Sequence, residues 1–191
     1  MFDNLNKYQI VLASNSPRRK SLLAEMGLPF EVQSSQGEET YPNDLASVNV
    51  AEFLARQKAD WFTDFSKNQL YITADTVVIL ADKILGKPAN FNEAVDMLSQ
   101  QSGNWHQVIT GVCIKSKNKE ISFSSVTDVL FKVLTQPEIE HYVKTYKPFD
   151  KAGAYGIQEW IGMIGIERIN GSYFNVVGLP TDSLFNNLKQ F

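Results

Sequence analysis

The hydrophobic positions of this chain follow two patterns, short apolar runs and longer stretches in which apolar residues recur every three or four positions. Runs of the first kind are typical of buried strands, and stretches of the second kind are typical of amphipathic helices. The runs predict strands at residues 10–12, 30–32, 70–80, 108–115, 121–134 and 163–169. The second pattern predicts helices at residues 16–26, 44–65, 92–102, 135–146 and 181–191.

Polar residues mark several of these helix boundaries. Ser16 is a good N-cap, and Pro17 suits the first helical position, where a missing N–H costs nothing. The sequence from Thr135 to Glu138 has the pattern of a capping box. We expect Asn92 and Thr181 to cap two further helices.

The order of the predicted elements defines a fold class. Strands and helices alternate in the first half of the chain, whereas residues 108–134 read as an antiparallel hairpin around a polar turn at 116–119. This order predicts an α/β fold with one elongated mixed β-sheet flanked by helices, forming two lobes with a central cleft. The length of 191 residues suits a single domain over residues 1–191.

Composition and charge narrow the classes of function. A net charge of −3 argues against a general nucleic-acid or acidic-membrane binder. The single cysteine, Cys113, lies in an apolar run, is expected in the core, and excludes an internal disulfide. The N-terminus has no apolar signal core, and no run approaches the roughly 20 apolar residues of a membrane span. The sequence therefore predicts a soluble, cytoplasmic protein.

The first predicted helix carries three cations, Arg18, Arg19 and Lys20, in its first turn. Cations there face the positive end of the helix macrodipole, at a cost of about 0.3–1 kcal/mol each. A bound anion would offset this cost, because N–H groups, two guanidinium groups and the hydroxyls of Ser14 and Ser16 would converge on a phosphate. The alternative is a solvated basic turn. We favour the phosphate site.

Asp75 is the strongest acidic candidate, because it interrupts the apolar run at 70–80 and a buried carboxylate without a partner is costly. We expect it to lie at a cleft as a metal ligand or as a base for water. The alternative is an aspartate at a strand bulge, satisfied by local N–H groups and Thr76. Glu38 and Glu39 add two carboxylates in a polar loop at residues 34–41.

Three lysines complete the set of charged candidates. Lys87 stands between a glycine and a proline, Lys151 precedes two glycines, and Lys58 lies in the helical stretch 44–65. His106 and His141 are too far apart for a metal motif and are expected to pack or to face solvent. Cations, a few acids and glycine-rich turns are what a magnesium-assisted phosphate-ester hydrolase needs. The residues alone do not identify the base.

Motifs along nearly the whole chain resemble those of the Maf nucleotide pyrophosphatases, once described as septum-formation inhibitors. These motifs are Leu12-Ala-Ser-Asn-Ser-Pro-Arg-Arg, Ala74-Asp-Thr-Val-Val, Leu85-Gly-Lys-Pro, Ser102-Gly-Asn-Trp-His, Thr110-Gly-Val, Asp150-Lys-Ala-Gly-Ala-Tyr-Gly-Ile-Gln and Gly171-Ser-Tyr-Phe-Asn-Val-Val-Gly-Leu-Pro. The resemblance implies hydrolysis of a nucleoside triphosphate between its α- and β-phosphates with a divalent cation, Mg²⁺ or Mn²⁺. It also implies the fold of that family.

The resemblance assigns roles to particular residues. It implies that Asp75 is the catalytic base and that Glu39 and Asp75 are the metal ligands, with Glu38 as the alternative to Glu39. The residues that it implies for substrate binding are Ser14, Arg18, Arg19, Lys58, Thr76, Lys87, Lys151 and Gln158.

One branch of that family resembles this sequence in combining Arg18, Thr76 and Gln158, and it prefers dTTP and UTP. The sister branch, which acts on 7-methyl-GTP, lacks the run Ala-Tyr-Gly-Ile-Gln. The Gln158 amide suits a pyrimidine edge, because it can both donate and accept. The next two residues, Glu159-Trp160, depart from the family pattern, because relatives often have small residues there. The larger side chains of this chain would narrow the base pocket.

The hypothesis is a cytoplasmic, metal-dependent pyrophosphatase for dTTP and UTP, or for modified pyrimidine triphosphates, that cleans the nucleotide pool and has a link to cell-division arrest. One alternative is a non-catalytic, nucleotide-sensing regulator of cell division. Another is a purine-type pyrophosphatase for inosine or xanthosine triphosphates. A nucleoside triphosphate is the expected partner, and no nucleic acid or membrane is expected. The sequence leaves open whether the chain forms a homodimer.

Overall fold

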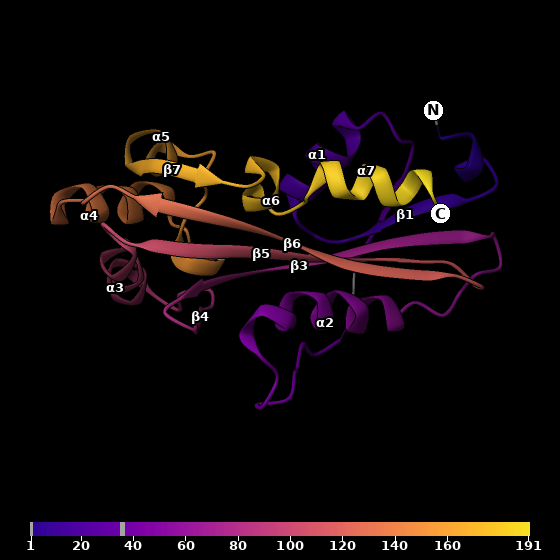
Figure 1. Ribbon diagram of the computed structural model, residues 1–191, viewed down its shortest axis with the longest axis horizontal. Coiled ribbons are helices and arrows are strands. Elements are labelled where there is room, and N and C mark those ends of the chain that lie inside the picture. Colours follow the sequence, from indigo (N-terminus) through magenta and orange to yellow (C-terminus); the bar gives the residue numbers. More distant parts are fainter. Residues whose placement is uncertain (1, 35–36) are drawn as a thin grey trace. The chain divides into compact units, whose positions relative to one another are not determined.

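The computed structural model describes residues 2–34 and 37–191. Two residues of the polar loop expected at 34–41, residues 35–36, lie outside the described part, as does Met1. The strands are β1 (Gln9–Ala13), β2 (Glu31–Gln33), β3 (Gln69–Leu80), β4 (Lys83–Leu85), β5 (Trp105–Lys115), β6 (Glu120–Phe131) and β7 (Ile166–Asn170). They form a mixed seven-stranded sheet in the order β2-β1-β3-β5-β6-β7, with β4 paired to β3 (Figure 1).

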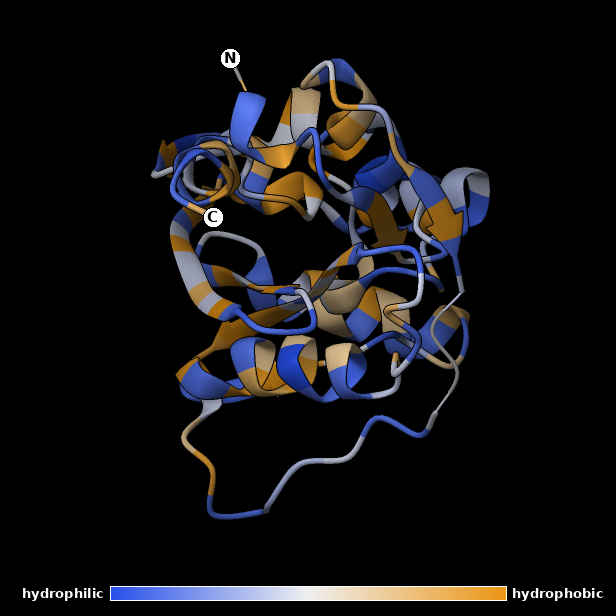
Figure 2. Ribbon diagram, turned by 90° about the vertical axis from the view of Figure 1, so that its right-hand side faces the viewer, coloured by the Kyte–Doolittle hydropathy of each residue, from blue (hydrophilic) through white to orange (hydrophobic). Residues whose placement is uncertain are grey.

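This mixed sheet, together with the helices of the described residues, confirms the expected α/β class. The helices are α1 (Pro17–Glu25), α2 (Ser47–Asp60), α3 (Phe91–Gln101), α4 (Gln136–Tyr146), α5 (Trp160–Gly165), α6 (Tyr173–Val177) and α7 (Thr181–Lys189), with short 3₁₀ turns η1 (Asp3–Leu5) and η2 (Ala152–Ala154). Figure 2 shows alternating hydrophilic and hydrophobic bands along the helices, as amphipathic helices have.

The described chain divides into two compact units. Unit 1 comprises residues 1–75, 110–125 and 178–191, and unit 2 comprises residues 76–109 and 126–177. Strands β3, β5 and β6 each contribute residues to both units. Asp75 is the last residue of its segment of unit 1, and Thr76 is the first of unit 2.

Unit 1 has helices on both faces of its strands, α2 on one side and α1 with α7 on the other (Figure 1). Strand β1 is parallel to both β2 and β3. Strands β1 and β3 are largely buried, as parallel strands between helices are, whereas β2 is exposed. Helix α2 lies unusually close to β5, because a Cβ built on Gly111 would be 2.3 Å from the Ala51 carbonyl. The buried Thr73 hydroxyl also donates to the Ala55 carbonyl at 2.6 Å. Only a glycine at position 111 allows helix α2 to approach β5 this closely.

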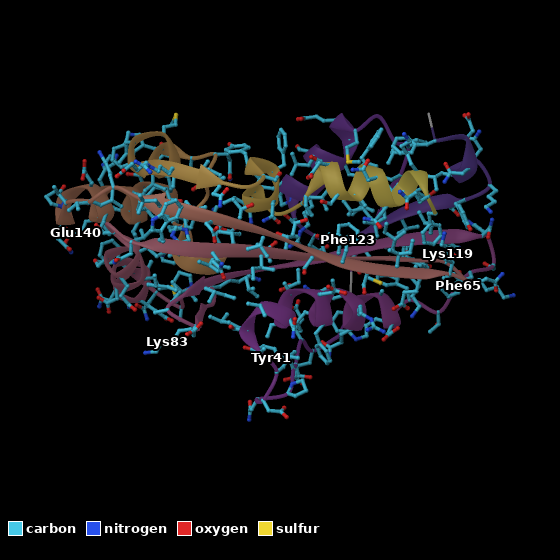
Figure 3. All side chains as sticks on the ribbon, in the orientation of Figure 1. Tyr41, Phe65, Lys83, Lys119, Phe123 and Glu140 are labelled. Carbon is cyan, nitrogen blue, oxygen red and sulfur yellow. The ribbon has the colours of Figure 1, made fainter. Side chains whose placement is uncertain are left out.

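The hairpin turn between β5 and β6 also lies in unit 1 and fastens the end of the chain. Lys119, labelled in Figure 3, donates from its ammonium to the Gln190 and Phe191 carbonyls at 2.8 and 2.9 Å. Its ammonium lies 4.8 Å from the centre of the Phe191 ring. The turn expected at 116–119 is confirmed, since the Ser116 N–H donates to the Lys119 carbonyl at 2.8 Å.

Unit 2 packs α3, α4 and α5 around one buried apolar cluster that includes Leu98, Phe131 and Tyr142. Its β3–β4 hairpin is a tight turn in which Ala81 and Asp82 have φ values of 46° and 66°. Two left-handed residues match the twist of a two-residue hairpin.

Helix boundaries follow local chemistry more closely than they follow apolar spacing. The helix expected at 44–65 spans only Ser47–Asp60. The apolar residues beyond it serve another purpose, because Phe62 and Phe65 leave the helix and pack on Tyr71, with ring centres 4.6 and 5.6 Å away. The expected extension to residue 65 was wrong because an aromatic cluster continued the apolar period.

Two of the expected caps were also wrong. Helix α3 is capped by Asn90, whose side chain accepts from the Glu93 N–H at 3.0 Å, so Asn92 already lies inside the helix. Helix α7 begins at Thr181 itself, and its N-cap is Pro180 without a side-chain bond. The caps at Ser16 and Thr135 are confirmed, the second as a complete capping box with Glu138.

The strand expected at 163–169 is half helix and half strand. Helix α5 runs to Gly165 before β7 begins at Ile166. A short apolar run cannot distinguish the two states. The first half of the run is helical in a tight turn, where a Cβ on Gly162 would be 1.8 Å from the Ile157 carbonyl oxygen. Helix α6 was not predicted, although Ser172 accepts from the Asn175 N–H at its start.

Cys113 lies in the core, as expected. Its side chain is fully buried beside Ala55 and Ala59, and burial raises the pKa of its thiol to about 12. Among the described helices, none combines the length and the apolar character needed to cross a bilayer.

Candidate active site

The start of α1 is built as a polar corner in unit 1. Ser14 follows β1, is buried, and accepts from the Ser16 N–H at 3.2 Å. The Ser16 hydroxyl in turn accepts from the Arg19 N–H at 3.4 Å, which caps the helix. The first turn of α1 contains no acidic residue, so its cations stand at the positive helix end as the sequence indicated.

Arg19 links three segments of unit 1. Its guanidinium donates to the Gly178 carbonyl at 2.8 Å and to the Ala74 carbonyl at 2.9 Å. Burial lowers the pKa of Arg19, and the negative charge of Asp75 opposes that shift. The guanidinium is therefore held rigidly beside the end of the unit-1 part of β3. Arg18 is half-buried in the same helical turn and is one of the charges that act on Arg19.

Lys58 joins the two predicted metal ligands. Its ammonium lies 2.6 Å from Asp75 Oδ1 and 3.1 Å from Glu39 Oε1. Its side chain is only 8% exposed, against 14% for Asp75 and 46% for Glu39. A buried ammonium needs such partners, because an unpaired charge in the interior is strongly destabilised. Helix α2, strand β3 and the loop that carries Glu39 thus place a cation and two carboxylates at one point.

The two carboxylates fit a divalent cation. Mg²⁺ is commonly held by one or two carboxylates together with substrate phosphates and water. Glu39 Oε1 and Asp75 Oδ1 both lie within hydrogen-bond distance of one ammonium, so their oxygens converge where a positive charge is stabilised. Among the described residues, no three His, Cys, Asp or Glu side chains gather as a metal cluster.

The loop after β2 supplies Glu39, and Tyr41, labelled in Figure 3, marks that loop. Of the two neighbouring glutamates, Glu39 forms the ion pair with Lys58. Glu38 is exposed. The loop is fastened to α2 by Gln57, whose side chain accepts from the Thr40 N–H at 3.2 Å and donates to the Thr40 carbonyl at 2.9 Å.

The remaining predicted residues lie in unit 2. Lys151 is buried, Thr76 is half-buried, and Lys87 and Gln158 are exposed. The segments that carry the two lysines meet, because the Gly153 N–H donates to the Gly86 carbonyl at 3.0 Å. The predicted site residues therefore fall into a group of six in unit 1 and a group of four in unit 2.

Sequence reasoning missed the partners of Lys151. Its ammonium lies 2.8 Å from Asp150 Oδ1 and 3.2 Å from Glu159 Oε1. Glu159 also accepts from the Tyr142 hydroxyl. One signal for Glu159 was available, because Glu159-Trp160 differs from the small residues of many relatives. The sequence analysis connected this difference only with the width of the base pocket.

His106 packs in the interior and His141 is exposed, and both outcomes are among those expected. His106 is buried and bonded to the Tyr155 hydroxyl at 2.7 Å, and burial lowers its pKa to about 4. The His141 ring lies edge-on to Trp160 at 5.0 Å. Neither histidine belongs to a group able to hold a metal within the described residues.

A mixed α/β sheet with a cation-rich helix start and a lysine-bridged carboxylate pair defines a class of protein suited to anionic, phosphorylated ligands. The sequence profile of the Maf family, described as "Maf-like protein", matches residues 9–191. The chain belongs to the Maf family.

Three relatives of full length carry the same name. The "dTTP/UTP pyrophosphatase" of Phocaeicola vulgatus is 50% identical over 192 residues and covers 100% of both chains. The protein of the same name from Parabacteroides distasonis is 50% identical over 193 residues, and that from Bacteroides thetaiotaomicron is 48% identical over 192 residues, each covering both chains fully.

Proposed function

We propose that this chain is a nucleoside triphosphate pyrophosphatase that hydrolyses dTTP and UTP to the monophosphate and pyrophosphate. The observation that carries the proposal is the 50% identity, over the full length of both chains, to relatives named for that activity. The cluster of Lys58 with Asp75 and Glu39 supports it, since cleavage of a phosphoanhydride needs positive charge and a base at one point.

In the proposed reaction, a water oxygen forms a bond to the α-phosphorus while the bond from that phosphorus to the bridging oxygen breaks. The electron pair of the broken bond leaves with pyrophosphate, and the water proton passes to the Asp75 carboxylate. The Lys58 ammonium, 2.6 Å from Asp75 Oδ1, keeps that carboxylate oriented and partly neutralised. Asp75 is thus the proposed catalytic base.

Glu39 and Asp75 are the proposed ligands of a divalent cation, Mg²⁺ or Mn²⁺, because their carboxylate oxygens converge on one cationic position. The cation, when bound, neutralises charge on the phosphates. Ser14, with its buried hydroxyl, and Arg19, with its fixed guanidinium, would donate to phosphate oxygens. The other proposed substrate-binding residues are Arg18, Lys58, Thr76, Lys87, Lys151 and Gln158.

Further parts of the proposal concern the whole molecule. Residues 1–191 act as a single domain with two lobes and a central cleft that receives the nucleotide. The exposed Gln158 amide reads the pyrimidine edge. The proposed cellular role is removal of unsuitable pyrimidine nucleotides in the cytoplasm, with a link to cell-division arrest.

The test is pyrophosphate release from a panel of dTTP, UTP, CTP, GTP, ITP and 7-methyl-GTP, with Mg²⁺ or Mn²⁺ and again with EDTA. We expect cation-dependent release that is strongest on dTTP and UTP and is lost with EDTA. Release strongest on ITP would favour the purine-type enzyme. Tight nucleotide binding by the folded chain without any release would favour the nucleotide sensor.

A second prediction concerns the start of α1. Replacing Arg18 with alanine is expected to lower kcat/KM about tenfold or more, since a charge-assisted bond to phosphate contributes about 1.5–3 kcal/mol. Lys20→Ala, an exposed cation in the same turn, is the matched control and should change kcat/KM less than about twofold. Equal and small effects of both variants would favour the solvated basic turn.

A further inference from the structure

In unit 2, the carboxylate of Glu159 lies between Tyr142 of α4 and Lys151. One carboxylate oxygen, Oε2, accepts from the Tyr142 hydroxyl, and the other, Oε1, lies 3.2 Å from the Lys151 ammonium. The Tyr142 hydroxyl itself accepts from the Gly156 N–H at 3.0 Å. Two hydrogen bonds and an ion pair therefore connect the backbone of Gly156 through Tyr142 and Glu159 to Lys151.

Burial makes this chain rigid. Tyr142 is fully buried, and both its burial and its bond to Glu159 raise its pKa, so the hydroxyl stays protonated and donates. The Lys151 side chain is 9% exposed and has two carboxylate partners, Glu159 at 20% exposure and Asp150 at 62%. Exposed ion pairs restrain a lysine weakly. The Asp150 carboxylate is nearer and accepts a hydrogen bond from the ammonium at 2.8 Å, but it is exposed. Glu159 is the less exposed partner, and its own position is fixed by the Tyr142 hydroxyl.

The backbone around Glu159 is fixed as well. Glu159 is the N-cap residue of α5, yet its side chain makes no capping bond and turns to Lys151 instead. Its N–H donates to the Gly156 carbonyl at 3.0 Å. The next residue, Trp160, packs on His141 and on the apolar cluster of unit 2. Helix capping thus does not explain this glutamate, whereas the contact with Lys151 does.

We propose that Glu159 is a positioning residue for the pyrophosphatase site, which acts through Lys151 and touches no substrate atom. It holds the Lys151 ammonium at one place, so that little side-chain entropy is lost when the lysine binds the phosphate oxygens that gain charge in the transition state. Through Tyr142 it also fixes Gly156, two residues before Gln158. The inference rests on the proposed function and deepens it by explaining how Lys151 is placed.

The test is a double-mutant cycle of Glu159→Gln and Lys151→Met in the full chain, read as kcat and KM for dTTP. Glu159→Gln alone is expected to lower kcat about tenfold while KM changes less than about threefold, as for other residues in contact. In the Lys151→Met background the same change should alter kcat less than about twofold. A merely structural role would instead give additive losses, and that result would overturn the inference.

Two further variants keep the test decisive. Glu167→Gln, which removes the same charge from a residue of β7 that is 51% exposed, is the matched control and should leave kcat unchanged. Tyr142→Phe keeps the Glu159 charge but removes its hydrogen bond, and we expect a smaller loss of kcat. It provides the test if Glu159→Gln does not fold, and an unchanged kcat would then overturn the inference.

The two proposals fail in different ways. If the native chain releases no pyrophosphate from any triphosphate, the proposed function fails. If the native chain is active and Glu159→Gln behaves as Glu167→Gln does, only the positioning role is overturned. Circular dichroism of each variant confirms that equal amounts of folded protein are compared.

Discussion

Replacing Asp75 with asparagine is expected to lower kcat by about 10²–10⁴-fold, the contribution typical of a general base. The amide has nearly the same size as the carboxylate and can still accept from Lys58, so the polar contacts of unit 1 persist. What it loses is the ability to take a proton from water. The measurement is pyrophosphate release from dTTP under saturating nucleotide and Mg²⁺.

The matched control for this prediction is Asp82→Asn. Asp82 is exposed in the turn after β3 with a φ of 66°, a conformation that asparagine tolerates well. We expect full turnover from this control and retained nucleotide binding from Asp75→Asn. Full turnover by Asp75→Asn would show that Asp75 is not the base.

Replacing Gly111 with alanine is expected to lower the free energy of unfolding by about 3 kcal/mol, at the upper end of the range for overpacked cores. The added Cβ would lie 2.3 Å from the Ala51 carbonyl and from the Glu52 nitrogen. These are backbone atoms, so helix α2 must move away from β5. Because α2 also carries Lys58, turnover should fall together with stability. Urea denaturation measures the loss.

Gly86→Ala provides the control for this second prediction. Nothing lies within 4 Å of a Cβ built on Gly86, so the same change should alter stability by no more than about 1 kcal/mol. A comparable loss in both variants would mean that the close approach of α2 to β5 does not limit stability.

The sequence predicted those elements whose signals are local. Ser16 and the capping box at Thr135 set helix starts through side chains that bond the adjacent backbone, and both were found. Prediction failed where a distant contact decided. Phe62 continued the helical period of α2, but Tyr71 holds it outside the helix. Short apolar runs, such as the one that became α5, carry no information that separates helix from strand.

The candidate site shows the same division. Local features identified the cation-rich start of α1 and the isolated carboxylate of Asp75. The pairing of Asp75 with Lys58 depends on how α2 packs against β3, which the spacing of 17 residues does not encode. The same holds for Glu159 and Tyr142, also 17 residues apart, whose bond is made only when α4 packs. The roles of Asp75 as base and of Glu39 as metal ligand came from the resemblance to the family, because the geometry alone does not assign them.

The burial of Cys113 has a practical consequence for spectroscopy. A thiol reacts as its thiolate, and this one is inaccessible with a pKa raised to about 12, so maleimide and spin-label reagents should not modify it near neutral pH. It is the sole cysteine of the chain. A fluorophore or nitroxide can therefore be attached at an introduced, exposed cysteine without removing the native one. A pair of such probes, one on each unit, would report changes in their separation as nucleotide binds.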